Sequence, residues 1–283
     1  MIAERRADYI GYSTREVFVT GADPAVVMLH GFGDSADTWW PVLRHLAATG
    51  LAGIAVDLPG FGDAGPLACG PILPQLDAFV ASLVSRHGAR QPVVLIGNSL
   101  GGLLTVRAAA ADRGLPIRGI LAIGTAGTGW TRLLHFVSKG NLAVVSLLAK
   151  APIPRLLYRR LTAFVARLVM YGRWRAGDPA YLRSFVHRLS TRPVMATALA
   201  LLPEVNAVTE FAEVACPTTV LHGRRDRLVS VAAALRLHDM IHHSRLVVLP
   251  DSGHCPQLDA PERVVALANE LATATFGDFS GTA

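Results

Sequence analysis

Cysteine is scarce in this chain, and long apolar runs are absent from it. The three cysteines are odd in number and show no metal-ligand spacing, which argues against a disulfide framework and against a zinc site (Cys69, Cys216 and Cys255). No uninterrupted apolar run approaches the roughly 18 residues that a membrane-spanning helix requires. Residues 1–8 are charged and lack the apolar core of a signal peptide. These absences predict a cytoplasmic protein with neither a metal site nor a membrane span.

Apolar residues are nevertheless abundant. With 283 residues, 51% of them hydrophobic, the chain can bury a large core as one elaborated α/β domain. Apolar runs of about five residues alternate with helical patterns, which predicts βαβ units and a parallel sheet. Residues 9–20 predict a leading antiparallel hairpin, with turn-forming residues at Gly11 and at 13–15. Further strands are predicted at 25–29, 52–56, 92–96, 119–123, 217–221 and 245–249, and helices at 38–49, 74–87, 102–112, 230–241 and 261–275.

One short motif lies between a predicted strand and a predicted helix. Gly97-Asn98-Ser99-Leu100-Gly101 matches the G-x-S-x-G nucleophile elbow in the setting that this motif requires. So sharp a turn holds the serine in a strained backbone conformation and exposes its hydroxyl above the sheet. Glycines on both sides remove the Cβ atoms that would collide as strand and helix approach each other. Ser99 is therefore the candidate nucleophile.

A serine nucleophile needs a base, and the base needs a third group to orient it. Asp226 follows the strand predicted at 217–221, and His254 follows the strand predicted at 245–249. Serine, acid and histidine thus occur in that order along the chain, each beyond the end of a strand. The sequence predicts that Ser99, Asp226 and His254 form a catalytic triad.

On these motifs the chain resembles the α/β-hydrolase superfamily over nearly its whole length. The resemblance implies an α/β-hydrolase fold: a mostly parallel central sheet with leading antiparallel strands, flanking helices and a helical cap. His30-Gly31-Phe32-Gly33 is similar to the family's His-Gly-x-Gly loop, and His30 would hold that loop in place. The resemblance implies an oxyanion hole made by the backbone amides of Phe32 and Leu100. Residues 57–62 are similar to the family's Asp-x-Pro-Gly-x-Gly turn, which identifies the fold and carries no chemistry.

The strand pattern stops in the middle of the chain. Residues 128–205 show only helical stretches broken by proline and glycine. In the superfamily that this chain resembles, an insertion at this point is a helical cap over the active site. We therefore predict a core domain of residues 1–127 and 206–283 with a cap of residues 128–205.

Three aromatic residues are candidates for substrate contact. Trp130 and Phe136 begin the predicted cap, and Trp39 lies soon after the predicted oxyanion loop. Core packing is the alternative for Trp39.

Positive charge is concentrated in the predicted cap. Residues 128–205 hold 12 Lys and Arg against 2 Asp and Glu, a net +10, whereas the remainder holds 15 against 19, a net −4. Nearly all the basic residues are arginine, but a genome rich in arginine codons would affect the whole chain and does not explain this contrast. The cap arginines alternate with apolar residues at roughly helical spacing. Three interpretations of this charge stay open: contact with an anionic membrane surface, steering of anionic substrates, and a plain solvated face. Nucleic-acid binding is not predicted, because no recognised binding module accompanies the charge.

The triad predicts a carboxylesterase-like serine hydrolase. Its small-molecule substrate would be an apolar ester or a related acyl compound, cleaved through an acyl-enzyme on Ser99 without a metal or an organic cofactor. The elbow at 97–102 also resembles that of the carbon-carbon bond hydrolases of aromatic degradation. Those enzymes have tryptophan where this chain has Cys255, and they use a cap arginine for which Arg192 is the candidate. A non-catalytic receptor for small apolar ligands is a further alternative on the same fold.

Overall fold

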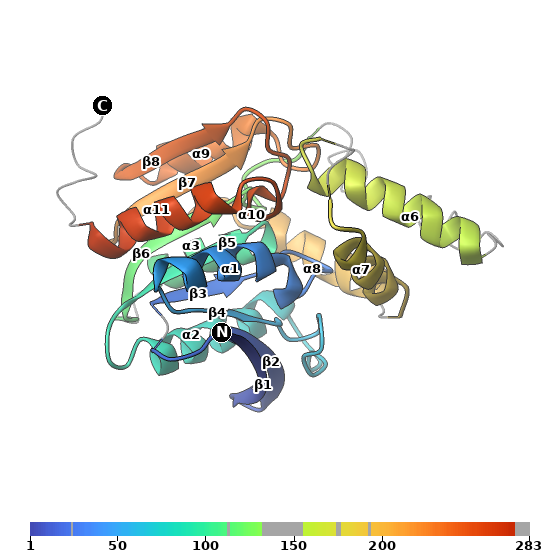
Figure 1. The fold of residues 1–283 in the computed structure, drawn as a ribbon. Coiled ribbons are helices and arrows are strands. Elements are labelled where there is room, and N and C mark those ends of the chain that lie inside the picture. The colour runs from blue at the N-terminus through green and yellow to red at the C-terminus, as the bar shows by residue number, and fades with distance from the viewer. Residues whose placement is uncertain (24, 112–113, 132–154, 174–176, 192–193, 275–283) are drawn as a thin grey trace.

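The computed structural model describes residues 1–23, 25–111, 114–131, 155–173, 177–191 and 194–274. Within these residues eight strands form one sheet in the order β1-β2-β4-β3-β5-β6-β7-β8 (Figure 1). They are β1 (Ile2–Tyr9), β2 (Tyr12–Val19), β3 (Val26–Leu29), β4 (Gly53–Val56), β5 (Val93–Asn98), β6 (Ile117–Ile123), β7 (Thr218–Gly223) and β8 (Ser244–Leu249). Strands β3 to β8 pair in parallel, whereas β2 pairs antiparallel with both β1 and β4. The predicted fold class is confirmed.

The leading hairpin is longer than the sequence pattern predicts. Its strands pair from Ile2↔Val19 to Tyr9↔Tyr12, and the turn lies at Ile10 and Gly11. Both turn residues have positive φ, 49° and 86°, as the tight turns of twisted hairpins require. Gly11 is thus confirmed as a turn residue. The turn chemistry predicted at 13–15 is wrong, because those residues pair within β2.

Helices cover both faces of the sheet. On one face are α1 (Trp40–Thr49), preceded by a 3-10 turn η1 (Ala36–Trp39), and α11 (Pro261–Thr273), preceded by the short α10 (Pro256–Asp259). On the other are α2 (Ile72–His87), α3 (Leu100–Ala110) and α9 (Val231–Met240). Strand β3 shows the division: Val26 and Met28 pack with the first set, and Val27 and Leu29 with the second. All four are fully buried, which explains why this strand reads as an unbroken apolar run.

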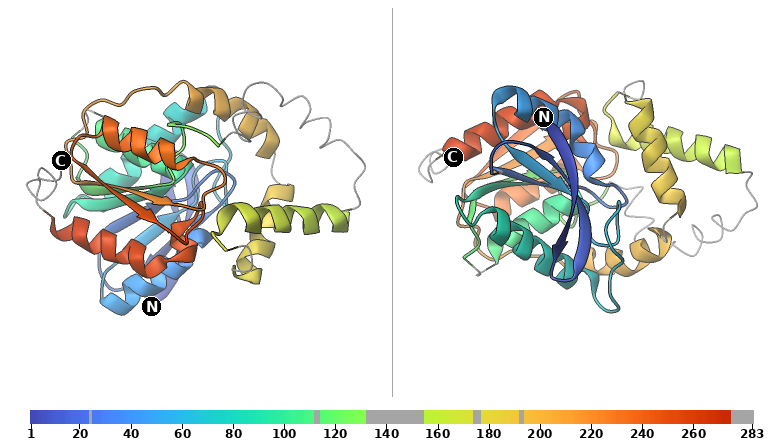
Figure 2. Two further views of the ribbon diagram at one scale, coloured as in Figure 1. Left: turned by 90° about the horizontal axis from the view of Figure 1, so that it is seen from above. Right: turned by 60° about the horizontal axis from the view of Figure 1, so that its bottom comes forward.

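Between β6 and β7, the described residues form three helices: α6 (Arg155–Met170), α7 (Pro179–Thr191) and α8 (Val194–Asn206). The described part of this segment contains no strand, and its single β-bridge joins Trp130 to Val229. Figure 2 shows α6 projecting away from the sheet and its covering helices. None of the described helices combines the length and apolar character that crossing a membrane requires. The division into a core and a cap of residues 128–205 stays a prediction.

Helix α8 stabilises the start of α2. The side chain of Glu204 accepts hydrogen bonds from the backbone N–H groups of Ile72 and Leu73, both at 2.8 Å. Those donors lie in the first turn of α2, where the helix itself offers no acceptor and where negative charge is favoured. The residue before α2 is Pro71, which has no side-chain cap to offer. A residue 131 positions away therefore caps the helix.

Candidate active site

Ser99 lies in the turn between β5 and α3. Its backbone has φ 56° and ψ −111°, and among the described residues it shares positive φ outside glycine only with Ile10. The flanking glycines are required by space. A Cβ atom at Gly97 would lie 2.0 Å from the Gly101 carbonyl oxygen, and a Cβ atom at Gly101 would lie 2.3 Å from the Leu29 oxygen. The strained serine turn that the motif predicts is therefore present, with the side chain of Ser99 partly exposed.

Asp226 and His254 are brought into direct contact. The Nδ1 atom of His254 lies 2.7 Å from Oδ2 of Asp226, although the two residues are 28 positions apart. The other carboxylate oxygen, Oδ1, accepts the backbone N–H groups of Leu228 at 2.7 Å and Val229 at 3.0 Å. With Nδ1–H directed at the carboxylate, Nε2 is the ring nitrogen that remains to accept a proton.

The electrostatics of this pair favour an ionised acid. Burial alone would raise the pKa of the Asp226 carboxyl, but the nearby His254 and its hydrogen bond outweigh burial and hold that pKa below its ordinary value. The Asp226 side chain is fully buried. A buried, ionised carboxylate fixed by two amides can orient the imidazole and stabilise its protonated form.

Asn98 connects the serine turn to the loop that carries His254, residues 250–255 between β8 and α10, which we call the histidine loop. The sequence analysis missed this role. Its Nδ2 donates to the carbonyl oxygen of His254 at 2.9 Å and to that of Ile123 at 3.3 Å. The backbone N–H of Ser99 donates to the same Ile123 oxygen at 2.8 Å. Gly124 leaves room for the ring, since a Cβ atom there would lie 3.3 Å from Nδ1 of His254. The ends of β5 and β6 and the histidine loop thus form one connected unit.

The loop after β3 lies beside the serine. A Cβ atom at Gly31 would be 3.2 Å from that of Ser99. His30 is buried, and its Nδ1 lies 2.7 Å from the Gly31 oxygen while its Nε2 accepts the Leu58 N–H at 2.9 Å. Burial lowers the pKa of His30, which favours the neutral ring that these two bonds require. His30 therefore ties the loop to the start of the 57–62 turn.

The two residues whose amides are predicted to form an oxyanion hole lie on either side of this junction. Phe32 follows Gly31 and packs edge-to-face on Phe61, with ring centroids 5.3 Å apart. Leu100 begins α3 directly after Ser99 and is buried. Their role as donors stays a prediction.

A second histidine lies beside the acid, and the sequence analysis did not single it out. The Nε2 atom of His222 is 3.6 Å from Oδ2 of Asp226 and 3.2 Å from the Val229 oxygen, to which it donates. Burial lowers the pKa of His222, so the neutral ring is favoured. We infer that His222 supports the loop that carries Asp226. Its position at the end of β7, next to Gly223, was the only signal in the sequence.

The end of α6 is fastened to the histidine loop through Asp259. One carboxylate oxygen of Asp259 accepts the Gly253 N–H at 2.7 Å and the Gly172 N–H at 2.9 Å. The Cys255 N–H donates to the Met170 oxygen at 3.0 Å. A Cβ atom at Gly172 would lie 1.9 Å from the Asp251 oxygen, so the two chain segments touch backbone to backbone. The residues flanking His254 are therefore packed directly against the segment that follows α6.

Helix α7 reaches the loop after β3. The Tyr181 hydroxyl donates to the buried Asp34 carboxylate at 2.7 Å, and Arg188 lies 2.8 Å from Asp37. Burial raises the pKa of Asp34 above its ordinary value. The Asp34 N–H donates to the Gly31 oxygen at 3.3 Å, so this contact lies one turn from the residue beside Ser99.

The predicted aromatic contacts have different positions. Trp39 is fully buried and packs with the α1 and α11 core, which is the alternative that the sequence left open for it. Trp130 is partly exposed, and its Nε1 donates to Asn206 at 2.7 Å. Phe136 and Arg192 lie outside the described residues.

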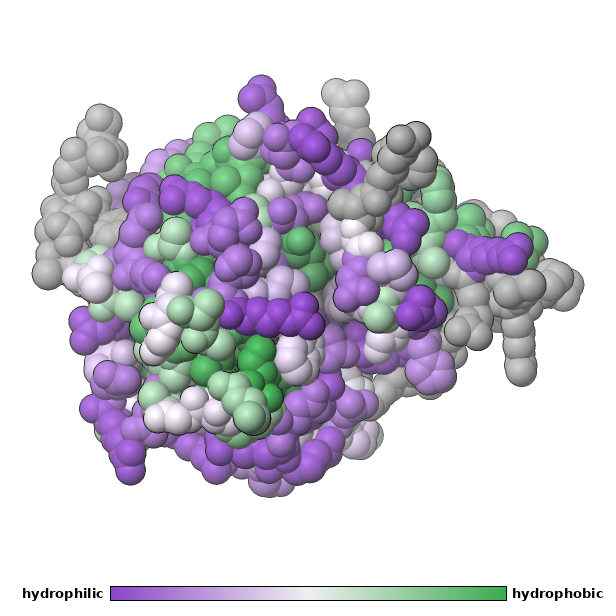
Figure 3. Space-filling model, viewed as in Figure 1, coloured by the Kyte–Doolittle hydropathy of each residue, from purple (hydrophilic) through white to green (hydrophobic). Residues whose placement is uncertain are grey.

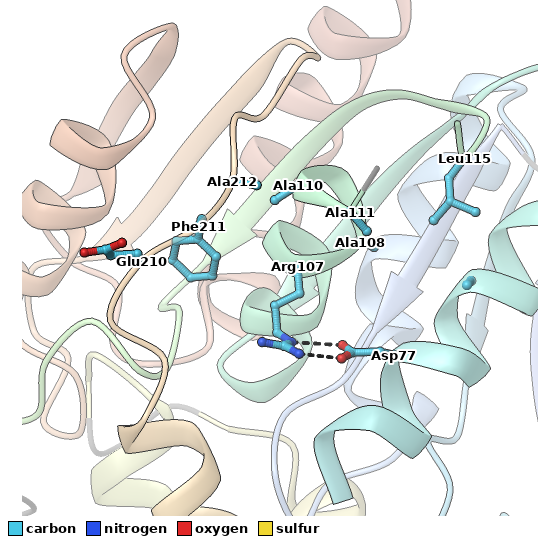
Figure 4. Close-up of a pocket in the computed structure, with 10 residues that line it drawn as sticks. Asp77, Arg107, Ala108, Ala110, Ala111, Leu115, Glu210, Phe211 and Ala212 are labelled. Atoms are coloured by element: carbon cyan, nitrogen blue, oxygen red, sulfur yellow. Dashed lines mark hydrogen bonds and ion pairs between the residues drawn. The ribbon is translucent and has the colours of Figure 1, made fainter. Parts of the chain in front are cut away.

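Two surface pockets lie apart from these residues. One, of about 260 Å³, lies over α2, α3 and the segment after α8, where Arg107 forms a two-pronged ion pair with Asp77 and Phe211 faces the pair (Figure 4). The other, of about 320 Å³, lies beside the leading hairpin and is lined by Arg5, Arg86 and Arg90 among others. Neither lining includes Ser99, Asp226 or His254. Among the described residues, no three His, Cys, Asp or Glu side chains are arranged to hold a metal ion.

Comparison with known proteins identifies relatives of this chain in sequence and in fold. Residues 26–267 match the model of the Alpha/beta hydrolase family. The chain is 29% identical to the pimeloyl-[acyl-carrier protein] methyl ester esterase of Chromobacterium violaceum, across 89% of this chain and 96% of that protein. It is also 29% identical to the 2-hydroxy-6-oxononadienedioate/2-hydroxy-6-oxononatrienedioate hydrolase of Cupriavidus pinatubonensis, across 84% of this chain and 83% of that protein. A solved thermophilic esterase superposes with a TM-score of 0.69 at 18% identity, across 96% of this chain and 99% of that one, and shares the fold.

Proposed function

Because the chain belongs to the Alpha/beta hydrolase family, we propose that it is a serine hydrolase that cleaves a carboxylic ester through an acyl-enzyme on Ser99. One observation carries the proposal. The positive-φ turn at Ser99 is joined to His254 through the side chain of Asn98, and the ring of His254 contacts the buried Asp226 carboxylate at 2.7 Å. Strain of this kind persists only where the surrounding structure holds it, and it is concentrated at functional sites. The proposal assigns Ser99, His254 and Asp226 their roles.

In the first half-reaction, Oγ of Ser99 attacks the ester carbonyl carbon and its proton passes to Nε2 of His254. The tetrahedral intermediate collapses, the bond to the alcohol oxygen breaks, and His254 returns the proton to the departing alcohol. Asp226 keeps the ring oriented and stabilises its charged form. Water then attacks the acyl-enzyme, His254 takes the water proton, and the acid leaves as the proton returns to Oγ.

The carbonyl oxygen gains negative charge in both steps, and we assign its stabilisation to the backbone N–H groups of Phe32 and Leu100. Two features support this assignment: Leu100 begins a helix, whose first N–H groups are free of helical acceptors, and Gly31 brings the Phe32 loop against Ser99. One such donor contributes on the order of 3 kcal/mol to catalysis.

We propose residues 128–205 as the cap over this site. The contacts of Tyr181 with Asp34 and of Gly172 with Asp259 support the idea, because both join that segment to loops that carry the proposed machinery. Within the cap, Trp130 and Phe136 are the candidates for contact with an apolar substrate.

A carbon-carbon bond hydrolase is the second candidate. The relative from Cupriavidus pinatubonensis, named as a 2-hydroxy-6-oxononadienedioate/2-hydroxy-6-oxononatrienedioate hydrolase, has the same 29% identity to this chain as the esterase has. The Gly-Asn-Ser-x-Gly-Gly elbow at 97–102 also favours it, and Asn98 has a structural role at the site. The presence of Cys255 after the histidine favours the esterase.

The test is hydrolysis of p-nitrophenyl esters of increasing acyl length, with a vinylogous diketone as the competing substrate. Ser99→Ala should lower kcat by roughly 10³-fold or more with unchanged folding. Ser230→Ala is the matched control, since Ser230 also begins a helix after a loop and its side chain makes no cap hydrogen bond. Faster cleavage of the diketone would favour the second candidate. Unchanged ester turnover in Ser99→Ala would refute the serine mechanism, and a wild-type protein that turns over neither substrate would favour a ligand receptor.

A further inference from the structure

Helix α6 exposes an apolar face to solvent. Leu157, Leu161, Phe164 and Val165 are 56%, 52%, 55% and 46% exposed, and they are the members of what we call the α6 stripe. Their spacing of i, i+4, i+7 and i+8 places them on one side of the helix. Single exposed apolar residues are common on protein surfaces, whereas a contiguous group marks a site of interaction.

The α6 stripe is not the face by which the helix packs. Ala166 and Met170 are buried in a cluster with Tyr181, Leu182 and Phe185 of α7 and other residues. Ala166 lies five positions after Leu161 and nine after Leu157, which places it on the opposite side of the helix. Helix α6 is therefore apolar on two sides, and only one is covered by the described core. Figure 1 shows the helix extending outward past α7, and Figure 3 shows hydrophobic and hydrophilic residues side by side at that end of the molecule.

Arginines lie beside the α6 stripe. Arg160 is exposed and follows Leu157 by three positions, and Arg167 follows Phe164 by three, so both lie along one border of the stripe. The surrounding segment 128–205 has a net charge of +10, in contrast to −4 for the remainder of the chain. The occupant of this face should therefore be anionic and should also provide an apolar layer.

We propose that the α6 stripe docks on an anionic lipid surface, with the helix lying in the plane of the interface. A bilayer with anionic headgroups offers both features that the stripe requires, and a convex helix with outward leucine and phenylalanine side chains fits a deformable lipid layer. Arginines near such a surface are attracted to its anionic headgroups, and the long arginine side chain can reach the headgroups while its stem lies along the apolar layer.

The attachment of α6 gives the docking a consequence for the site. The helix ends at Met170, whose carbonyl oxygen accepts the Cys255 N–H, and Gly172 shares the Asp259 carboxylate with Gly253. A helix held on the lipid surface thus keeps the loop of His254 next to that surface. Apolar molecules partition into the same layer, which would raise their concentration where the proposed chemistry occurs.

The test is co-sedimentation of the full chain with vesicles of phosphatidylcholine alone or of phosphatidylcholine mixed with phosphatidylglycerol. We expect binding to the anionic vesicles that weakens with added salt. The double variant Leu161→Glu with Phe164→Glu should bind at least about tenfold more weakly. Leu235→Glu is its matched control, because Leu235 is also an exposed leucine, 46% accessible, on helix α9 of the core.

The charge is tested separately. Arg160→Glu should weaken binding to the anionic vesicles, whereas Arg118→Glu, on an exposed position of β6, should not. Equal binding to both vesicle types, no binding to either, or equal losses in the control variants would overturn the proposal. So would a stripe-dependent dimer, or binding to soluble polyglutamate, without vesicle binding; those results would assign the face to a second copy or to an acidic protein. Vesicle binding is read without any substrate, so its outcome is independent of the proposed hydrolase activity.

Discussion

The Tyr181 hydroxyl donates a 2.7 Å hydrogen bond to the Asp34 carboxylate and so joins helix α7 to the loop that approaches Ser99. Both side chains are buried, at 8% and 3% exposure, and burial raises the pKa of each. A buried carboxyl group is costly to leave without its partners. The contact therefore couples the position of the proposed cap to the proposed oxyanion loop.

Tyr181→Phe should weaken this coupling while preserving the ring that stacks near Phe185. We expect a loss of about 1–3 kcal/mol in unfolding free energy, because Asp34 loses a buried donor, together with a lower kcat for ester hydrolysis. Urea unfolding and steady-state kinetics measure the two effects. Tyr12→Phe is the control, since it removes a tyrosine hydroxyl that bonds Gln75 at 2.7 Å on another part of the core. Equal effects of both substitutions on kcat would contradict the coupling.

Asp226→Asn tests the acid. An amide in place of the carboxylate favours the wrong tautomer of His254 and removes its counter-charge, so kcat should fall by about 10⁴-fold with little change in KM. Steady-state kinetics on a p-nitrophenyl ester measures the fall. Asp251→Asn changes an exposed carboxylate of the histidine loop, paired with Arg225, and should leave kcat within about twofold, as a surface ion pair contributes little. A comparable loss in both variants would show that loop charge in general, and not Asp226, supports catalysis.

Asp259→Ala should leave the N–H groups of Gly172 and Gly253 without their acceptor, and the histidine loop should lose its fixed position. We expect kcat to fall roughly tenfold or more while KM changes less, with a lower melting temperature. Asp259→Asn retains a carbonyl oxygen that can accept both bonds, so it should restore most of kcat. If alanine and asparagine lower the melting temperature equally and neither alters kcat, Asp259 has a structural role alone.

A buried cluster at the leading hairpin predicts acid sensitivity. Glu16 is fully buried and accepts hydrogen bonds from Tyr9 and from Arg5, and Nε2 of His87 lies 3.4 Å from its carboxylate. Burial opposes ionisation, but these partners outweigh it and lower the pKa of Glu16 from 4.5 to about 2. A group whose pKa is lower in the folded state contributes stability that is present above pH 4.5 and is lost as the pH falls toward 2.

The loss for Glu16 should amount to about 3 kcal/mol at most. Urea unfolding at a series of acidic pH values should show the wild type losing stability through this window. Glu16→Gln should start less stable and show a flatter profile. Parallel profiles of the two proteins would contradict the assignment.

Much of the site could be predicted because each catalytic candidate follows a strand. Parallel strands bring their carboxyl ends to one edge, so Ser99, Asp226 and His254 had to lie near one another once their strands were identified. The contact of Asn98 with His254 spans 156 positions and depends on how β5 lies beside the loop after β8, which no local pattern specifies. The contacts of Asp259 and Tyr181 were missed for the same reason.

Local patterns were least reliable where neighbouring elements decide the outcome. Trp39 lies close in sequence to the loop beside Ser99, yet the η1 turn directs its side chain into the α1 and α11 core. Helix α3 begins at Leu100, two positions before the pattern predicts, because the serine turn leads straight into it. Helix α2 likewise begins at Ile72, where the distant Glu204 supplies the cap.

Reaction with a fluorophosphonate probe, read by mass spectrometry, tests the central claim most directly. A serine activated by His254 should take up one probe per chain, and peptide mapping should locate it on Ser99. Ser99→Ala should remain unlabelled, and His254→Ala should react far more slowly. A folded wild-type protein that remains unlabelled, or that carries the same adduct in the Ser99→Ala variant, would contradict the account.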